Sequence, residues 1–474
     1  MKRFWLVLLS LGLVMAFSVS AFAVDVKVSA EYYAAGLYLN KTSVNDGWGT
    51  EANDNGSTAF FFQRLRVGTD FIVSPGLKLV TRFDALERIW GGARSNVWQV
   101  NAVQPELSAG TRAESENIAF DSAYIDYTSP IGSFQVGYMP DSTWGTVFGN
   151  DSIGSDRGMI KWSAPAGPVI LVANYAKIKD NSSSAVSTQS WYWKNNLNAT
   201  RTDRDSESYR AGFIVPFKNE KANGQAGVLF IFTRDASNRG EASGPYMTKI
   251  YQANPYFKAN IGPVALQGEA KYSFGNAVEM EYNIPGNDKK IDSLSVFLDG
   301  NAKFGMVNVG GSFAYLQGDD NAGDDVVHDV NTGGLDWNPC LIMFNTDIVQ
   351  YWVGGIEGHT GSQVGGPMKN AWFGQLRAGV SPTPQFDILA SVSYATADKK
   401  NVNPYHTSGD RYPGSGYGTE IDITGTYKIT NNLSYMLGIG YLFTGDNFKG
   451  RDLADEDYKT NDDFIVINKL TLSF

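Results

Sequence analysis

Residues 420–443 have the sequence EIDITGTYKITNNLSYMLGIGYLF, and their order of polar and apolar residues indicates the fold class. Polar and apolar residues alternate through its first ten positions, which is the period of an extended strand whose side chains point to opposite faces in turn. The polar face carries three charges and two threonines: Glu420, Asp422, Thr424, Thr426 and Lys428. The opposite face is apolar: Ile421, Ile423, Gly425, Tyr427 and Ile429. A Lys or Arg that faces lipid costs about 2–4 kcal/mol at the bilayer midplane, so in a membrane the charged face must point inward.

The same pattern continues beyond a short turn. Thr430-Asn431-Asn432 contains residues that favour turns, and residues 433–443 alternate again. Two-strand units of this kind recur along the chain, each joined by a short connecting segment, most of which contain Gly, Pro or Ser. The expected strand pairs are 59–73 with 77–88, 117–128 with 133–139, 249–260 with 264–274, 291–304 with 307–317, and 371–380 with 385–396.

Long polar segments separate these units. They cover residues 40–57, 89–116, 179–206, 318–370, 397–417 and 444–462. A regular alternation of short turns with long loops is typical of an all-β transmembrane antiparallel β-barrel, with periplasmic turns and extracellular loops. The expected strand number is about eighteen, or about sixteen if the poorly alternating residues 158–178 form a single element, since closure requires an even number. A soluble β-sandwich or propeller does not explain the alternation of connection lengths.

The N-terminus has the features of a secretory signal peptide. Lys2 and Arg3 precede an apolar run over residues 4–17, and Ala21-Phe22-Ala23 supplies a small-residue cleavage site. The apolar run is shorter than the roughly 20 residues of a membrane-spanning helix. We therefore expect residues 1–23 to be removed and residues 24–474 to form a single barrel domain.

Charge and cysteine content limit the partners and cofactors. The formal net charge is −10 with no basic block, which argues against nucleic acid as a partner. Cys340 is the only cysteine, so the chain has neither an internal disulfide nor a CxxCH haem attachment. We expect no cofactor, and we interpret Cys340 as a small residue without a chemical role, although a free thiol or an intermolecular bridge stays open.

The last strand introduces a resemblance. Residues 464–474 alternate and end in the aromatic residue Phe474. This resembles the terminal recognition strand of Gram-negative outer-membrane proteins, and the mature chain resembles the trimeric diffusion porins. The resemblance implies a homotrimer in the outer membrane, in contact with lipid, that passes small polar solutes and ions and is not an enzyme. It also implies a role for Phe474 in barrel assembly.

A second resemblance concerns the loop after the fifth strand, which in porins of sixteen or eighteen strands folds into the lumen as a constriction. Residues 140–157 occupy that place and carry Asp141, Asp151 and Asp156. Trp144 and Phe148 are available to pin this loop against the wall.

Basic residues are expected to face the acidic loop. Arg64 and Arg66 are two residues apart and share a face, and Arg82 has the same inward phase as Asp84. We expect these four residues to form the constriction with the loop aspartates and to give a weak anion preference. Further lumen-facing residues are expected to be Arg210, Lys258, Glu269, Lys271, Arg377, Glu420, Asp422 and Lys428.

An enzyme, the sheath of an electron conduit and a substrate-specific channel are the alternatives to the porin hypothesis. An enzyme on a barrel is disfavoured because all three histidines fall in expected exterior loops, although His328 lies among Asp324, Asp325 and Asp329 as a weak candidate metal patch. The alternatives that stay open are the barrel sheath of an electron conduit, whose haems belong to a partner cytochrome, and a substrate-specific channel. Polar Gln63 and Asn468 fall on the nominal lipid face and mark either a subunit contact or a bulge.

Overall fold

The computed structural model describes residues 24–46, 56–91, 118–181, 203–240, 245–280, 288–320, 324–359, 362–400, 414–449 and 459–474. The expected signal peptide over residues 1–23 lies outside this part of the chain. No helix among the described residues is both long and apolar enough to cross a membrane.

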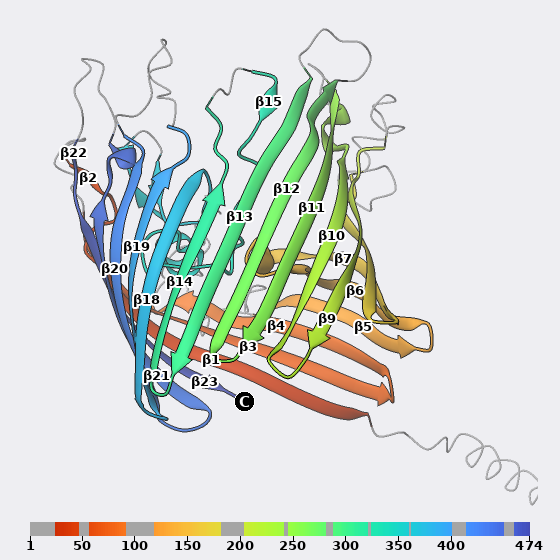
Figure 1. Ribbon diagram of the computed structural model, residues 1–474, viewed down its shortest axis with the longest axis horizontal. Coiled ribbons are helices and arrows are strands. Elements are labelled where there is room, and N and C mark those ends of the chain that lie inside the picture. Colours follow the sequence, from red (N-terminus) through yellow and green to blue (C-terminus); the bar gives the residue numbers. More distant parts are fainter. Residues whose placement is uncertain are drawn as a thin grey trace, which may run out of the picture.

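Eighteen long antiparallel strands form a closed barrel (Figure 1). Each strand pairs with its sequence neighbour in the barrel, and β1 pairs with both β3 and β23, which closes the cylinder. The strands are β1 (Asp25–Leu39), β3 (Thr58–Ser74), β4 (Leu77–Ile89), β5 (Ile118–Ser129), β6 (Gly132–Trp144), β7 (Gly149–Ala166), β8 (Val169–Lys179), β9 (Ser206–Lys218), β10 (Ala222–Asp235), β11 (Tyr246–Ile261), β12 (Val264–Met280), β13 (Lys289–Phe304), β14 (Val307–Leu316), β18 (Ala371–Thr383), β19 (Phe386–Ala397), β20 (Gly416–Lys428), β21 (Leu433–Thr444) and β23 (Asp463–Ser473).

The predicted fold class is therefore confirmed, with eighteen strands rather than sixteen. The poorly alternating residues 158–178 form parts of two strands, β7 and β8, which pair from Gly158 to the turn. Minor elements decorate the connections: β2 (Asn45–Asp46), β15 (Val326–Val327), β16 (Ile356–Glu357), β17 (Gln363–Val364), β22 (Lys459–Thr460), η2 (Ser237–Gly240), η3 (Thr346–Val353) and η5 (Asp446–Phe448).

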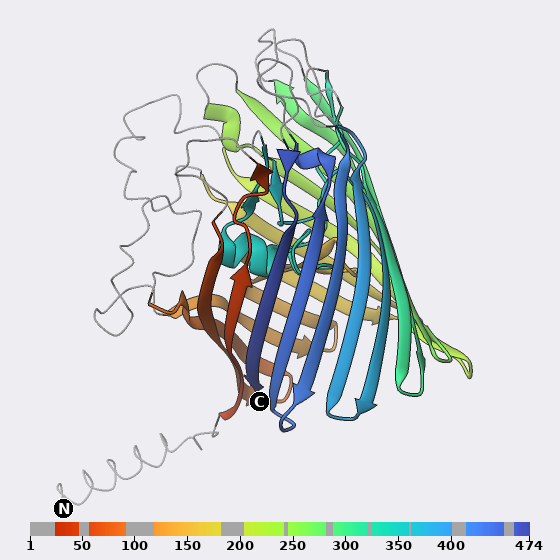
Figure 2. The same ribbon diagram turned by 90° about the vertical axis from the view of Figure 1, so that its left-hand side faces the viewer.

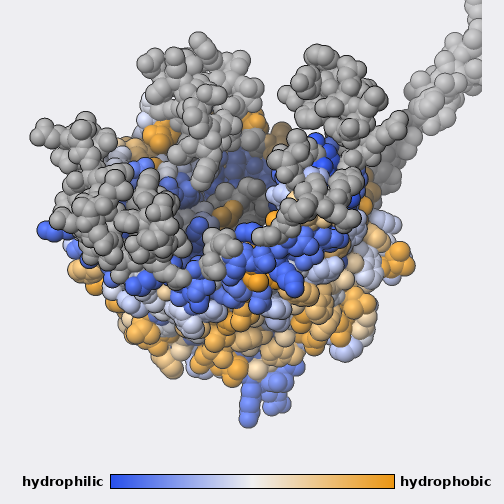
Figure 3. Space-filling view, turned by 90° about the horizontal axis from the view of Figure 1, so that it is seen from above, coloured by the Kyte–Doolittle hydropathy of each residue, from blue (hydrophilic) through white to orange (hydrophobic). Residues whose placement is uncertain are grey.

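In residues 420–428, side chains point alternately inward and outward, as the sequence predicts. Ile421 and Ile423 are 40% and 54% exposed on the outer wall, whereas Glu420 is fully buried inside. Figure 3, seen from above, shows apolar side chains over the outer wall below a polar rim. The outer face therefore presents an apolar belt to its surroundings, which is the polarity that a lipid-embedded barrel needs.

The interior is not an open cylinder, because part of the long segment between β14 and β18 folds into it. Figure 2 shows η3 inside the barrel, enclosed by strands from both ends of the chain. Residues 340–359 and 362–368 contribute Ile342, Met343 and Trp352 to a large apolar core, and we call these residues the plug. Burial of apolar surface yields about 25 cal/mol per Å² and holds such a segment in place.

The sequence places residues 318–370 among the long extracellular loops and leaves open whether they close the mouth; part of this segment, the plug, lies inside the barrel. Its partners are apolar residues on the inner faces of the strands, among them Leu39, Phe373, Leu442, Ile465 and Ile467. Apolar side chains facing a water-filled lumen would be costly, and here the plug covers them. The inner wall on this side is thus a protein core rather than a pore lining.

Candidate pore constriction

The connection between β6 and β7 leaves the barrel wall as a two-stranded arm. β5 pairs with β6 only as far as Tyr138, and β8 pairs with β7 only from Gly158. Between these points β6 and β7 pair with each other up to Trp144 and Gly149. Residues 139–157 are therefore separate from both neighbouring strands, and we call them the arm. They correspond closely to the segment 140–157 singled out in the sequence.

The tip of the arm wraps around one carboxylate on the inner wall. Oε2 of Glu269, on β12, accepts hydrogen bonds from the backbone N–H of Thr146 at 2.6 Å, of Val147 at 2.8 Å and of Phe148 at 3.3 Å. The Thr146 hydroxyl donates a fourth, at 2.8 Å. Gly145 has φ +75°, and a Cβ there would lie 2.5 Å from Glu269 Oε1. Several donors on one ionised acceptor make a strong, directional anchor.

An interruption in the wall supplies the second anchor. Pro255 has no N–H, and the β11–β12 ladder has no pairing at residues 254 and 255. The carbonyl oxygen of Asn254 instead accepts a hydrogen bond from Trp144 Nε1 at 2.9 Å. The Trp144 ring also packs edge-on against Tyr256, with centroids 5.1 Å apart. The proline that departs from the strand pattern thus accompanies the docking of the arm.

The arm and the segment that leads into the plug meet at one side chain of the wall. Phe148 of the arm packs edge-on against Phe297 of β13 at 6.5 Å, and Trp337 packs against the same ring at 5.1 Å. The two inward segments therefore share a contact point, so that each limits the room available to the other.

Ion pairs surround the base of the arm. Asp141 is 7% exposed and pairs with Arg157 at 3.1 Å and with Arg210 at 2.5 Å. Asp156 lies 3.9 Å from Arg82, whose nearer partner is Asp121 at 3.1 Å. The sequence assigned Asp141 to the side facing the Arg64 group, and the structure gives it different partners, Arg157 and Arg210.

The expected basic cluster is assembled on adjacent strands but is outnumbered by acids. Arg66 forms two hydrogen bonds of 2.7 Å with Asp84. Arg64 lies 3.5 Å from Glu31 and 3.8 Å from Glu87 and stands over the Tyr33 ring. With the two carboxylates that pair with Arg82, three arginines meet five carboxylates, of which only Asp84 and Asp156 were expected from the sequence. Asp151 lies in β7, and its side chain is outside the described part.

The other expected lumen residues fall into different environments. Arg377 pairs with Asp299 at 2.5 Å, and Lys258 stands over the Tyr256 ring at 6.0 Å. Lys428 is exposed at the short-turn end of β20. Phe474 exchanges backbone hydrogen bonds with Ala30 of β1, so the terminal residue takes part in closing the barrel.

Glu420 and Asp422 point inward but bind the plug rather than water. The two oxygens of Glu420 accept hydrogen bonds from the backbone N–H of Ile342 at 2.6 Å and of Met343 at 2.7 Å. Asp422 accepts one from Leu341 at 3.4 Å. A signal for this contact was present in the sequence. Apolar residues such as Phe373 and Leu442 occupy inward positions, where the wall of a water-filled pore is polar, and they indicate that another segment covers them.

One group of three side chains in the described residues has metal-ligand types close together. Ligand atoms of Cys340, Glu420 and Asp422 lie within 4.8 Å of one another, all buried. Plug amides bond both oxygens of Glu420 and Oδ2 of Asp422. Burial, with the two carboxylate charges adding to it, raises the pKa of the Cys340 thiol. His328 belongs to no such group in the described part; its Nδ1 lies 2.6 Å from the Asp292 carbonyl oxygen.

A polar chamber lies beside the arm, along the inner faces of β5–β12. Its volume is about 630 Å³. Its ionisable lining consists of Asp126, Asp141, Arg157, Lys161, Arg210 and Lys271, so four cationic side chains face two carboxylates. Water has room in this part of the barrel, in contrast to the side that the plug fills.

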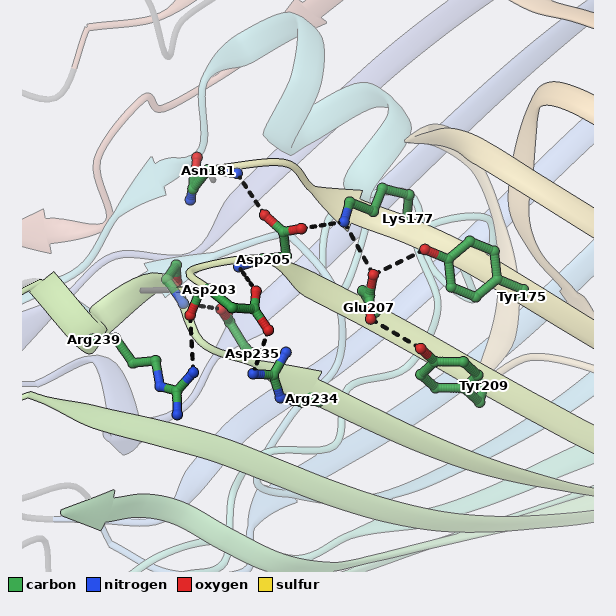
Figure 4. A network of polar contacts seen from close by, with 11 residues as sticks. Tyr175, Lys177, Asn181, Asp203, Asp205, Glu207, Tyr209, Arg234, Asp235 and Arg239 are labelled. Carbon is green, nitrogen blue, oxygen red and sulfur yellow. Dashed lines mark hydrogen bonds and ion pairs between the residues drawn. The ribbon is translucent and has the colours of Figure 1, made fainter. Parts of the chain in front are cut away.

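A charged network marks the upper limit of the apolar belt on the outer wall (Figure 4). Glu207 accepts hydrogen bonds from the hydroxyls of Tyr175 at 3.0 Å and Tyr209 at 2.9 Å, and pairs with Lys177. Lys177 also contacts Asp205. Below it, aromatic rings contact one another across β8–β12: Tyr175, Tyr209, Phe232, Tyr251 and Phe274. Rings with hydroxyls toward a polar edge are typical of a membrane–water boundary.

Comparison with known proteins gives structural likeness alone. No protein-family model matches the chain, and no curated protein matches its sequence. The barrel resembles outer-membrane porins. OpdK from Pseudomonas aeruginosa has 12% identity and a TM-score of 0.46, with 94% of this chain and 99% of that chain covered. A BenF-like porin from Pseudomonas fluorescens has 9% identity and a TM-score of 0.47, covering 95% and 99%. An anion-selective porin from Comamonas acidovorans has 11% identity and a TM-score of 0.39, covering 95% and 99%.

Proposed function

We propose that this chain is a porin of the Gram-negative outer membrane, through which small polar solutes and ions diffuse passively. The observation that carries the proposal is the opposite polarity of the two barrel surfaces. The outer wall is apolar with an aromatic and charged upper edge, and the interior keeps a polar chamber of about 630 Å³. A closed cylinder with these two surfaces is stable in lipid and wet inside, which is what passive conduction requires.

The finer proposal is a weak anion preference. The chamber supports it, because four cationic side chains face two carboxylates there. The Arg64, Arg66 and Arg82 group does not supply it alone, since five carboxylates pair with these three arginines. One charge 8 Å from an ion is worth about 0.5 kcal/mol in water-like surroundings, so the preference is a bias rather than an exclusion.

The experiment is conductance in planar bilayers. Purified full-length protein is expected to give stepwise increases in current. In a salt gradient, we expect a small reversal potential whose sign indicates anion selectivity. Insertion without ion conduction would contradict the channel. A reversal potential whose sign indicates cation selectivity would contradict the anion preference but not the channel.

A substrate-specific channel is the second candidate, favoured by how much of the interior the arm and the plug occupy. A sheath for a partner cytochrome fits this interior poorly, because the plug core already fills the space that such a partner would need.

The homotrimer is part of the proposal and is tested by the mass of the purified complex. On the outer wall, Gln63 accepts hydrogen bonds from Trp90 at 2.8 Å and Tyr32 at 3.3 Å, which lowers the cost of a polar residue there.

A further inference from the structure

The contact between the plug and β20 brings three buried side chains of metal-ligand type together. Cys340 is the first residue of the plug, and Glu420 and Asp422 are two residues apart on the inner face of β20. One ligand atom of each side chain lies within 4.8 Å of the other two. The plug and β20 are far apart in the chain, so this group is assembled only when the plug is seated.

The two carboxylates of this group lack a cationic partner. Neither Glu420 nor Asp422 forms an ion pair with a Lys or Arg in the described part of the chain. Their partners from the plug are three backbone N–H groups, which carry only partial charge. Two like charges side by side in a buried place are costly unless a cation or a shared proton offsets them.

One oxygen of Asp422 is left without a donor. Oδ2 accepts the hydrogen bond from the Leu341 N–H, whereas Oδ1 is buried and has no hydrogen-bond partner among the described residues. The residue is only 5% exposed. Gly440 faces Asp422 across the β20–β21 ladder, and a Cβ there would lie 2.6 Å from Oδ1, so glycine leaves room beside this oxygen. A buried polar atom without a partner is costly, and a bound ion satisfies it.

The ligand types indicate which metal ion fits. Ca²⁺ and Mg²⁺ take oxygen ligands throughout, whereas a thiolate favours softer ions such as Zn²⁺. Zinc binds sulfur at about 2.3 Å and carboxylate oxygen at about 2.0–2.2 Å, so the ligand atoms of a tetrahedral site lie about 3.3–3.6 Å apart. Side-chain adjustments of about 1 Å are enough to close the present group around such an ion.

We propose that Cys340, Glu420 and Asp422 form a structural site for a divalent transition-metal ion of the Zn²⁺ type, which fastens the plug to β20. The Cys340 thiol proton passes to solvent when the ion binds, because the thiolate is the ligand. The ion enters as the plug folds against the wall, since all three side chains are buried afterwards. This inference goes beyond the proposed porin function, because it concerns what holds the interior of the barrel closed on the side of the plug.

The test uses Co²⁺ as a spectroscopic substitute for Zn²⁺. Full-length protein is refolded in detergent with Zn²⁺, with Co²⁺ or with a chelator, and unbound metal is removed by gel filtration. We expect one bound ion per chain. The cobalt form is expected to show the charge-transfer absorption of a thiolate ligand, which only Cys340 can supply because the chain has no other cysteine. In mild denaturant, maleimide labelling of the zinc form is expected to be at least tenfold slower than labelling of the chelator-treated form.

Three variants locate the ion. Cys340→Ser is expected to abolish the charge-transfer absorption. Asp422→Asn is expected to weaken zinc binding at least tenfold, measured by competition with a chelating dye, since changes around a metal typically cost about 10–100-fold in affinity. Glu279→Gln is the matched control, because it removes a carboxylate from β12 that pairs with Lys249 instead, and it is expected to bind zinc like the parent.

The parent protein decides first, so the outcome does not depend on whether a variant folds. A refolded parent without cobalt charge-transfer absorption would overturn the site, and a shared proton would then be what offsets the two carboxylates. Equal zinc retention by the parent, Cys340→Ser and Asp422→Asn would also overturn it, because the ion would then lie elsewhere. None of these readouts is a conductance, so failure of the metal site leaves the porin function standing.

Discussion

At the scale of single residues, the sequence predicts which face a side chain occupies but not what it contacts there. Parity assigned Glu269 and Glu420 to the interior, and both lie there, fully or almost fully buried. Their partners are backbone N–H groups of the arm and of the plug, which are far away in the chain. Every residue except proline has a backbone N–H, so the residue types along the chain do not indicate where such a contact forms.

The Glu269 carboxylate is expected to hold the arm tip in place. Hydrogen bonds to a charged group contribute about 1.5–3 kcal/mol, and four donors of the arm tip converge on Glu269 Oε2. Glu269→Ala is therefore expected to release the arm tip and raise both the mean single-channel conductance and the current noise. Glu269→Gln keeps an acceptor oxygen and is expected to have a conductance and a current noise between those of Glu269→Ala and the parent.

Glu279→Gln is the control for this prediction, because Glu279 lies on the same strand and pairs with Lys249 away from the arm. Parent-like conductance and noise in the Glu269→Ala channel would show that Trp144 and Phe148 hold the arm without the carboxylate.

At the scale of elements, the sequence located thirteen of the eighteen long strands with their turns, because the period of two and the turn residues are local signals; it set no bounds for β1 or for β7–β10. Residues 420–428 and 433–443, for example, are strands as expected. The arm was placed through a resemblance rather than through local pattern. The plug was missed because residues 340–368 obey no simple period, and their apolar residues find partners on strands at both ends of the chain.

The reactivity of Cys340 reports whether the plug is closed. The thiol is buried, and burial raises its pKa, so it is both shielded and protonated. In the native parent, labelling by a maleimide is expected to be at least tenfold slower than after denaturation. Glu420→Ala strips the acceptor from the Ile342 and Met343 amides, at about 1–3 kcal/mol for each unsatisfied buried group, and is expected to speed labelling by tenfold or more.

Thr424→Val on the same strand is the matched control and is expected to label like the parent. Fast labelling of the native parent would mean that the plug opens readily by itself. An unchanged rate in Glu420→Ala would mean that apolar packing alone holds the plug, so either result would reject the carboxylate as its anchor.

At the scale of the whole molecule, closure follows from pairing rules that the sequence already contained, since an even number of antiparallel strands brings β1 beside β23. The distribution of lumen charge does not follow in this way. It depends on which acids fold beside which bases, and Asp121, Glu31 and Glu87 were identified as partners only through the barrel geometry. Two groups of opposite excess charge result: an acidic one around Arg64, Arg66 and Arg82, and a basic one in the chamber.

If ions pass both groups in turn, the selectivity of the pore is a small difference between opposing biases, and single charges in the acidic group shift it in opposite directions. Arg82 and Asp121 are partners at 3.1 Å with similar exposure, which makes them a matched pair. Arg82→Gln is expected to change the anion-to-cation permeability ratio about twofold toward cations, and Asp121→Asn about twofold toward anions, as about 0.5 kcal/mol per charge implies. Both shifts are expected to shrink at high salt, because the Debye length falls to about 3 Å at 1 M. Reversal potentials at low and high ionic strength measure both effects. Shifts of the same sign in the two variants would mean that the mutations act by moving the arm, through Asp156, rather than through the field in the pore.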